Sequence, residues 1–172
     1  MRNLLAVCVV SLLAFQPLSG SAQGAAPAAH AISMEPIQCG AAAPAINEEG
    51  FVRLGGIEQW VTIKGSDCRK PVILFIHGGP GNPNTPFANP PYAAWEKAFT
   101  LVQWAQRGAG KTFSRNPATS DGSFTTIPMA KDANELAALL QTLLKTLEGF
   151  LFDGSWASVL TFHMAKQPPH LF

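Results

Sequence analysis

The chain has 172 residues, of which 47% are hydrophobic and 13% are charged, and its formal net charge is +1. This length suits one domain, and this composition favours a globular core over a disordered chain. The charge balance offers nothing to attract a nucleic acid or an anionic membrane. Metal-binding patterns such as CxxC pairs and HExxH do not occur in the sequence, so neither a metal site nor a cofactor is predicted.

Residues 1–22 have the layout of a secretory signal peptide. Arg2 supplies the positive start, an apolar run follows from Leu4 to Phe15, and Gly20-Ser21-Ala22 offers small residues for cleavage. The apolar run is shorter than the about 20 residues that span a bilayer, so no stable membrane span is predicted. We expect export to the periplasm or the medium. An uncleaved N-terminal anchor is the alternative.

Residues 23–45 are rich in alanine and proline and predict a flexible leader, followed by one folded domain over residues 46–172. Two cysteines lie beyond the signal peptide, Cys39 and Cys68. In an oxidising compartment they could form a disulfide, which would stabilise the fold by roughly 3–4 kcal/mol. Two unrelated thiols are the alternative.

The first part of the domain is predicted to consist of strands. Phe51–Leu54 and Ile57–Ile63, joined by Gly55-Gly56, have the pattern of a β-hairpin. The continuous apolar runs Val72–Ile76 and Thr100–Trp104 are typical of strands that are covered on both faces, as in a parallel sheet.

Helices alternate with strands in the rest of the domain. One or two helical turns are predicted at Tyr92–Phe99. A long helix with an apolar stripe is predicted to begin at Pro128 and to end at Gly149. A brief strand at Phe150–Phe152 and a final helix at Ser158–Lys166 are predicted to follow. Strands alternating with helices predict right-handed crossovers. The predicted fold class is therefore α/β, with an N-terminal β-hairpin followed by a mostly parallel sheet and flanking helices.

A glycine-rich segment, His77-Gly78-Gly79-Pro80-Gly81, directly follows the strand Val72–Ile76. Exposed backbone N–H groups at such a position could stabilise an oxyanion. Pro80 has no N–H and can only shape the loop, so Gly79 is the candidate donor. A tight turn or close packing is the alternative explanation for the same glycines.

A second glycine-rich segment, Ala105–Thr112, has the spacing of a phosphate-binding P-loop, except that Ala105 stands in place of the first glycine. A P-loop must open a helix whose N-terminus holds the phosphates. Pro117 allows only a very short helix here, so nucleotide binding is disfavoured.

The two segments together resemble the proline iminopeptidase branch of the α/β-hydrolases. That branch carries HGGPG and, one strand later, a W-D-Q-R-G-x-G-[KR]-[ST] segment, which Trp104–Thr112 matches closely. The resemblance extends over residues 46–172. It implies a partial α/β-hydrolase fold and the release of an N-terminal residue, typically proline, from a peptide or a small amide or ester, without metal or cofactor.

The resemblance also implies a site. The segment Asp153-Gly154-Ser155-Trp156-Ala157 lies where the family has its G-x-S-x-G motif, after the fifth strand. Ser155 is then the nucleophile, and the N–H groups of Gly79 and Trp156 form the oxyanion hole. The residues that shape the oxyanion loop would be His77, Gly78, Pro80 and Gly81. An alternative role for Ser155 is to cap the helix that follows.

Three positions depart from the family pattern. Asp153 and Ala157 replace the outer glycines of G-x-S-x-G, and we expect Asp153 to place a carboxylate in a crowded, buried position. Ala105 replaces an aspartate and removes a charge that could have paired with Arg107. These departures suggest relaxed constraint or altered function.

A serine nucleophile needs a histidine base and an orienting carboxylate, which in this family follow the serine. His163 lies eight positions after Ser155 on the same predicted helix, about 12 Å along its axis, and cannot turn back. His170 has no acid placed before it, and His77 lies in the glycine-rich loop. The sequence therefore predicts the N-terminal half of an exported serine hydrolase, with an inactive truncated fragment or a decayed copy as the alternative.

Overall fold

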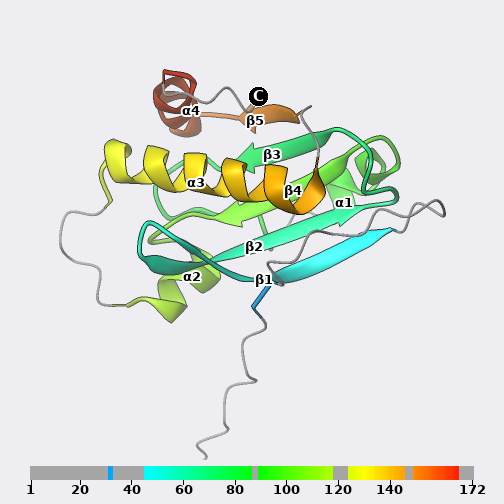
Figure 1. Cartoon of the computed structure of the whole chain (residues 1–172). Coiled ribbons are helices and arrows are strands. Elements are labelled where there is room, and N and C mark those ends of the chain that lie inside the picture. Colours follow the sequence, from blue (N-terminus) through cyan, green and yellow to red (C-terminus); the bar gives the residue numbers. More distant parts are fainter. Residues whose placement is uncertain (1–30, 33–44, 87–88, 118–123, 146–148, 167–172) are drawn as a thin grey trace, which may run out of the picture.

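The computed structural model describes residues 31–32, 45–86, 89–117, 124–145 and 149–166. Five strands form one mixed sheet in the order β1-β2-β4-β3-β5 (Figure 1). The strands are β1 (Ile46–Leu54), β2 (Ile57–Gly65), β3 (Val72–Ile76), β4 (Thr100–Ala105) and β5 (Gly149–Asp153). The helices are α1 (Asn89–Tyr92), the 3₁₀ helix η1 (Trp95–Lys97), α2 (Gly110–Arg115), α3 (Thr126–Leu144) and α4 (Ala157–Ala165).

The predicted hairpin is confirmed, with both strands longer than the sequence suggested. Gly55 and Gly56 have φ angles of +53° and +84°, the combination that a two-residue type I′ turn requires. β1 pairs antiparallel with β2, and β2 pairs antiparallel with β4. Beyond the hairpin, β4, β3 and β5 run parallel. The carboxyl ends of these three strands therefore meet at one edge of the sheet, where ligands of open α/β sheets bind.

Helices α3 and α4 cover one face of the sheet (Figure 1). The apolar stripe of α3 packs on strand residues such as Leu74 and Val102, as the 3.6-residue periodicity predicts. The boundaries differ from the prediction. α3 begins at Thr126, two residues before Pro128, and Gly149 is the first residue of β5 rather than a helix stop. A proline in the first helical turn costs no hydrogen bond, which explains the earlier start.

A buried ion pair joins α3 to the segment after β4. Arg107 donates from Nε and Nη2 to the carboxylate of Asp132 at 2.5 and 2.8 Å. Gln59 donates to the same carboxylate at 2.7 Å and accepts from the indole N–H of Trp104 at 2.9 Å. A Cβ atom at Gly55 would overlap the Asp132 side chain, so the turn glycine also makes room for this pair. The network fastens the hairpin, β4 and α3 together.

The partner of Arg107 was not predicted. Ala105, where the family has aspartate, is buried, and the carboxylate that Arg107 needs comes from Asp132 instead. A signal for it existed in the sequence. Asp132 lies three positions after Met129 and one before Ala133, so it is a charged residue within the apolar stripe of a helix. A charge at such a position requires a buried partner.

The segment that resembles a P-loop has structural contacts instead. α2 is only six residues long. The Thr112 hydroxyl accepts a hydrogen bond from the backbone N–H of Trp60 at 2.8 Å and donates to the carbonyl oxygen of Ala105 at 2.5 Å. The ammonium of Lys111 lies 3.5 Å from the centroid of the Trp60 ring. Both side chains that would bind phosphate in a P-loop therefore hold β2 against α2.

Three residues of the predicted leader are described, namely Ala31, Ile32 and Ala45. Ala31 forms an isolated bridge with Phe51 of β1, and Ile32 is buried against the core. Cys68 is buried and disulfide-bonded. Cys39 and the predicted signal peptide lie outside the described residues, so the pairing of Cys39 with Cys68 stays a prediction.

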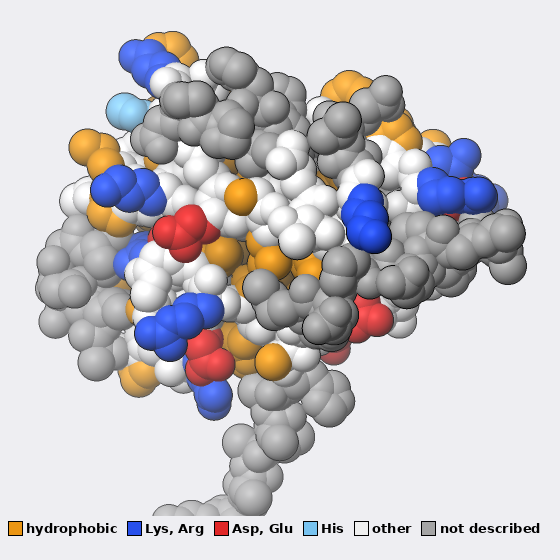
Figure 2. Space-filling view, in the orientation of Figure 1, with side chains coloured by type: hydrophobic (Ala, Val, Ile, Leu, Met, Phe, Trp, Pro, Cys, Tyr) orange, Lys and Arg blue, Asp and Glu red, His pale blue; other side chains and the backbone are white. Residues whose placement is uncertain are grey.

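Basic and acidic side chains are interspersed on the face shown in Figure 2, where the described residues form no broad patch of a single sign. None of the described helices is both long and apolar enough to cross a membrane.

Candidate active site

Ser155 lies on a sharp turn between β5 and α4. Its φ angle is +60°, in the left-handed region that residues with a Cβ rarely adopt. Such strain is typical of a nucleophile elbow, where a strand-to-helix turn exposes the serine hydroxyl. The alternative role as a helix cap is wrong, because Trp156 occupies the N-cap position of α4 and no side chain caps the helix.

The glycine-rich loop after β3 lies directly against this turn. A Cβ atom at Gly78 would lie 2.8 Å from the carbonyl oxygen of Gly154 and 3.2 Å from the Cβ of Ser155. No side chain fits in this space, so Gly78 permits the close approach of the loop to the serine. The structure thus brings together the two segments that the sequence analysis assigned to one site.

Pro80 and Gly81 shape the loop as a β-turn. The carbonyl oxygen of Gly79 accepts a hydrogen bond from the N–H of Asn82 at 3.0 Å. Gly81 has a φ angle of +88°, as the third position of a type II turn requires, and Pro80 occupies the second position, where proline is favoured. The predicted shaping role of both residues agrees with this geometry.

Two backbone donors next to Ser155 are unpaired. Among the described residues, neither the N–H of Gly79 nor that of Trp156 has an acceptor. Unpaired N–H groups at an exposed turn are available to an oxyanion. Their assignment as the oxyanion hole stays a prediction, and their positions are compatible with it.

His77 fastens the loop to the segment after β4. Its Nε2 accepts the backbone N–H of Gln106 at 3.2 Å, and its Nδ1 lies 3.1 Å from the carbonyl oxygen of Gly78. Because Nε2 accepts, the proton of the neutral ring resides on Nδ1, which donates to Gly78. Burial lowers the pKa of His77 below its usual value. Both ring nitrogens are occupied, so His77 holds the loop in place and does not act as a base for Ser155.

The environment of Asp153, one of the three departures from the family pattern, differs from the predicted one. Asp153 is half-buried rather than buried, and its carboxylate accepts a hydrogen bond from the hydroxyl of Ser158 at 2.8 Å. The start of a helix favours a carboxylate, because the helix dipole is positive there. Ala157 is buried in the core beside Leu160, so its methyl group is accommodated.

A hollow of about 410 Å³ lies over the site and includes Ser155, Gly79 and Phe152 in its lining. Its size lies within the range of small-molecule sites. Asn82 and Asn84 also line it. These two residues and Phe152 were not predicted from the sequence as parts of the site. Asn82 and Asn84 come just after HGGPG and Phe152 comes just before the turn at Ser155, and these positions could have indicated their proximity to the site.

The described residues do not supply a complete triad. The hydroxyl of Ser155 has no hydrogen-bond partner among them. His163 lies on α4 with its ring against Phe162, at a centroid distance of 6.2 Å. His170 lies outside the described residues. Within the described segments there is also no group of three or more His, Cys, Asp or Glu that could hold a metal ion.

Known proteins share this fold. No protein-family model matches the chain. The chain is 34% identical over 119 residues to the probable aminopeptidase YbaC of Bacillus subtilis (strain 168), a match that covers 69% of this chain and 37% of that protein. A crystal structure of a proline iminopeptidase-related protein from Thermus thermophilus has a TM-score of 0.58 at 22% identity, over 71% of this chain and 41% of that one. An epoxide hydrolase variant from Vigna radiata has a TM-score of 0.54 at 25% identity, over 69% of this chain and 34% of that one.

The chain resembles the α/β-hydrolases in fold and in sequence. The predicted resemblance is confirmed, and the structure is a partial α/β-hydrolase fold. The chain spans less than half the length of each of these relatives. A proline iminopeptidase-related protein and an epoxide hydrolase share the fold, so the fold alone does not determine the reaction. The roles of Ser155, Gly79 and Trp156 stay predictions that rest on local geometry.

Proposed function

We propose that this hydrolase chain provides the nucleophile and the oxyanion loop of a serine hydrolase of the prolyl aminopeptidase type. The observation that carries the proposal is the left-handed conformation of Ser155, held against Gly78 of the glycine-rich loop. A strained serine beside unpaired N–H groups suits nucleophilic attack on a carbonyl carbon. The aminopeptidase name of the relative from Bacillus subtilis supports release of an N-terminal residue. The preference for proline rests on the resemblance of the two glycine-rich segments to the proline iminopeptidase branch.

In the proposed reaction, the Ser155 hydroxyl attacks the carbonyl of a peptide or small amide or ester. The N–H groups of Gly79 and Trp156 stabilise the oxyanion that develops, and loss of one such donor costs about 10²–10³ in rate. The general base and its carboxylate must come from outside the described residues, because both nitrogens of His77 are occupied and His163 lies on α4, eight positions after Ser155. The proposal requires neither metal nor cofactor.

The occupied ring of His77 and the unpaired hydroxyl of Ser155 favour a second candidate, a chain that does not catalyse the reaction. Hydrolysis of L-proline p-nitroanilide distinguishes the two candidates. The proposal predicts release of p-nitroaniline by the native protein and its loss in the Ser155→Ala variant, with the N-acetylated substrate turned over poorly because it has no free N-terminus. Equal release by the native protein and the variant would favour the non-catalytic candidate.

The proposal includes export of the protein. The layout of residues 1–22 supports it, and so does the buried disulfide at Cys68, because disulfides persist in oxidising compartments. N-terminal sequencing of the protein from its source would test it. The proposal predicts a start near Gln23, whereas a start at Met1 would contradict cleavage.

A further inference from the structure

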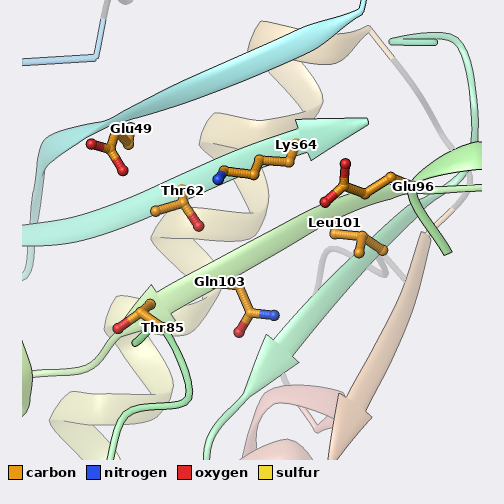
Figure 3. A pocket seen from close by; sticks show the side chains of 7 residues that line it. All are labelled: Glu49, Thr62, Lys64, Thr85, Glu96, Leu101 and Gln103. Atoms are coloured by element: carbon orange, nitrogen blue, oxygen red, sulfur yellow. The ribbon is translucent and has the colours of Figure 1, made fainter. Parts of the chain in front are cut away.

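A second pocket lies on the face of the sheet that does not carry α3 (Figure 3). It opens over the hairpin and β4, and its lining includes Glu49, Thr62, Lys64 and Gln103, with Thr85 from the segment after β3 and Glu96 from η1. Strand register explains why these side chains meet. Glu49 is paired with Thr62, and Thr62 with Gln103, so the three form one row across β1, β2 and β4 on the same face.

One polar group in this pocket has no partner among the described residues. Gln103 is only 5% exposed, and its Nε2 atom makes no hydrogen bond to any of them. A buried amide donor without an acceptor is costly, and native proteins seldom leave one unsatisfied. Gln103 lines the pocket, so an oxygen atom of a bound molecule could accept this hydrogen bond.

The charges around the pocket select the rest of the ligand. The lining contains two carboxylates, those of Glu49 and Glu96, and one ammonium, that of Lys64, so it has an excess of one negative charge. This balance favours a cation. A ligand that carries an ammonium group and, close to it, a carbonyl or carboxylate oxygen would balance the excess negative charge and accept the hydrogen bond of Gln103.

The size of the pocket limits the ligand further. The cavity measures about 70 Å³. At roughly 10–15 Å³ for each water-sized occupant, it has room for about five to seven non-hydrogen atoms. Glycine and glycinamide are of this size, whereas a peptide could insert only its first residue.

We propose that this pocket binds an α-ammonium group together with the adjacent carbonyl oxygen, as found in a small amino acid or at the free N-terminus of a peptide. Gln103 donates to the oxygen, Glu49 receives the ammonium, and Glu96, on the other side of Lys64, adds negative charge to the lining. The pocket is separate from the Ser155 site, with which it shares no lining residue. The inference therefore does not depend on the proposed function.

Isothermal titration of the purified chain with glycinamide, glycine, methylamine and acetamide tests the proposal. We expect saturable binding of glycinamide or glycine with a Kd of about 1–10 mM. Methylamine and acetamide each carry only one of the two groups and should bind at least about tenfold more weakly. Binding of glycinamide alone would indicate a peptide N-terminus, and binding of glycine would indicate a free amino acid.

Three variants locate the binding. Gln103→Leu and Glu49→Gln should each weaken binding about tenfold or more, because the first removes the donor to the ligand oxygen and the second removes the charge that attracts the ammonium. Glu48→Gln is the matched control, since Glu48 carries the same charge on the opposite face of β1 and should change the Kd less than about twofold. Glu49 is exposed, so its variant folds even if Gln103→Leu does not.

No saturable binding by glycinamide or glycine would overturn the proposal. Binding that methylamine matches, or that Gln103→Leu and Glu49→Gln leave unchanged, would overturn it as well.

Discussion

A Cβ atom at Gly78 would lie 2.8 Å from the carbonyl oxygen of Gly154, so the glycine-rich loop after β3 touches the turn that presents the candidate nucleophile. The two segments are distant in sequence, and parallel pairing of β3 with β5 brings their ends together. The first glycine of the loop therefore serves packing. The unpaired N–H of the next one, Gly79, remains available for chemistry.

Replacement of Gly78 by alanine tests this contact. The new methyl group meets backbone atoms, which cannot move away cheaply, so we expect a loss of about 1–3 kcal/mol in the free energy of unfolding. Gly154→Ala is the matched control, because a Cβ there meets nothing within 4 Å, and it should change stability by less than about 1 kcal/mol. Urea denaturation of both variants gives the comparison. Equal losses would show that the loop does not press on the turn.

The buried pair of Arg107 and Asp132 should matter greatly for stability. Asp132→Ala leaves the guanidinium of Arg107 buried without its carboxylate, which typically costs about 3–5 kcal/mol. The control is Glu58→Ala, which breaks the exposed pair with Arg115 and should cost less than about 1 kcal/mol. Chemical denaturation measures both changes. Similar costs would contradict the central place of the buried network.

His77 should make stability depend on pH. Burial lowers its pKa in the folded state below the usual 6.5, so in this window the unfolded chain binds more protons than the folded one. The contribution of His77 is complete above pH 6.5 and is lost as the pH falls toward the folded pKa, with a slope of at most about 1.4 kcal/mol per pH unit. Urea titrations below pH 6.5 should show this slope, and His77→Gln should remove it. An unchanged slope in the variant would assign the effect to another group.

The disulfide of Cys68 should involve Cys39. Digestion without reduction followed by mass spectrometry should find the two cysteines in one linked peptide pair, and reduction should lower the free energy of unfolding by roughly 3–4 kcal/mol. Protein purified from its source under conditions that block thiols is the material required. A free thiol at Cys68 would argue against the disulfide and weaken the case for export.

Local patterns predicted the elements of the fold well. The run Val72–Ile76 is a strand with the predicted bounds, and the hairpin turns at Gly55-Gly56. Both features could be predicted because a run of apolar residues and a pair of turn glycines determine the local structure within a few residues. The predicted boundaries of elements were wrong where the local pattern allowed two assignments. Gly149 could end a helix or begin a strand, and only its pairing with Val72 decides the matter.

The site was predictable only in part. HGGPG and the segment around Ser155 could be matched to a family, but the environment of each side chain depends on tertiary contacts. Asp153 reaches the start of α4 instead of a crowded interior, and Arg107 finds its carboxylate on α3. The unpaired amide of Gln103 likewise follows from strand register, which the sequence of one strand does not contain.

The central claim is that Ser155 is a nucleophile. Treatment of the native protein, recovered from its source, with a serine-directed fluorophosphonate probe tests it most directly. Peptide mass spectrometry should place a single adduct on Ser155, formed much faster than on any other serine, and the Ser155→Ala variant should carry none. The absence of an adduct at Ser155 in the native protein would contradict the claim and leave the strained turn without a catalytic role.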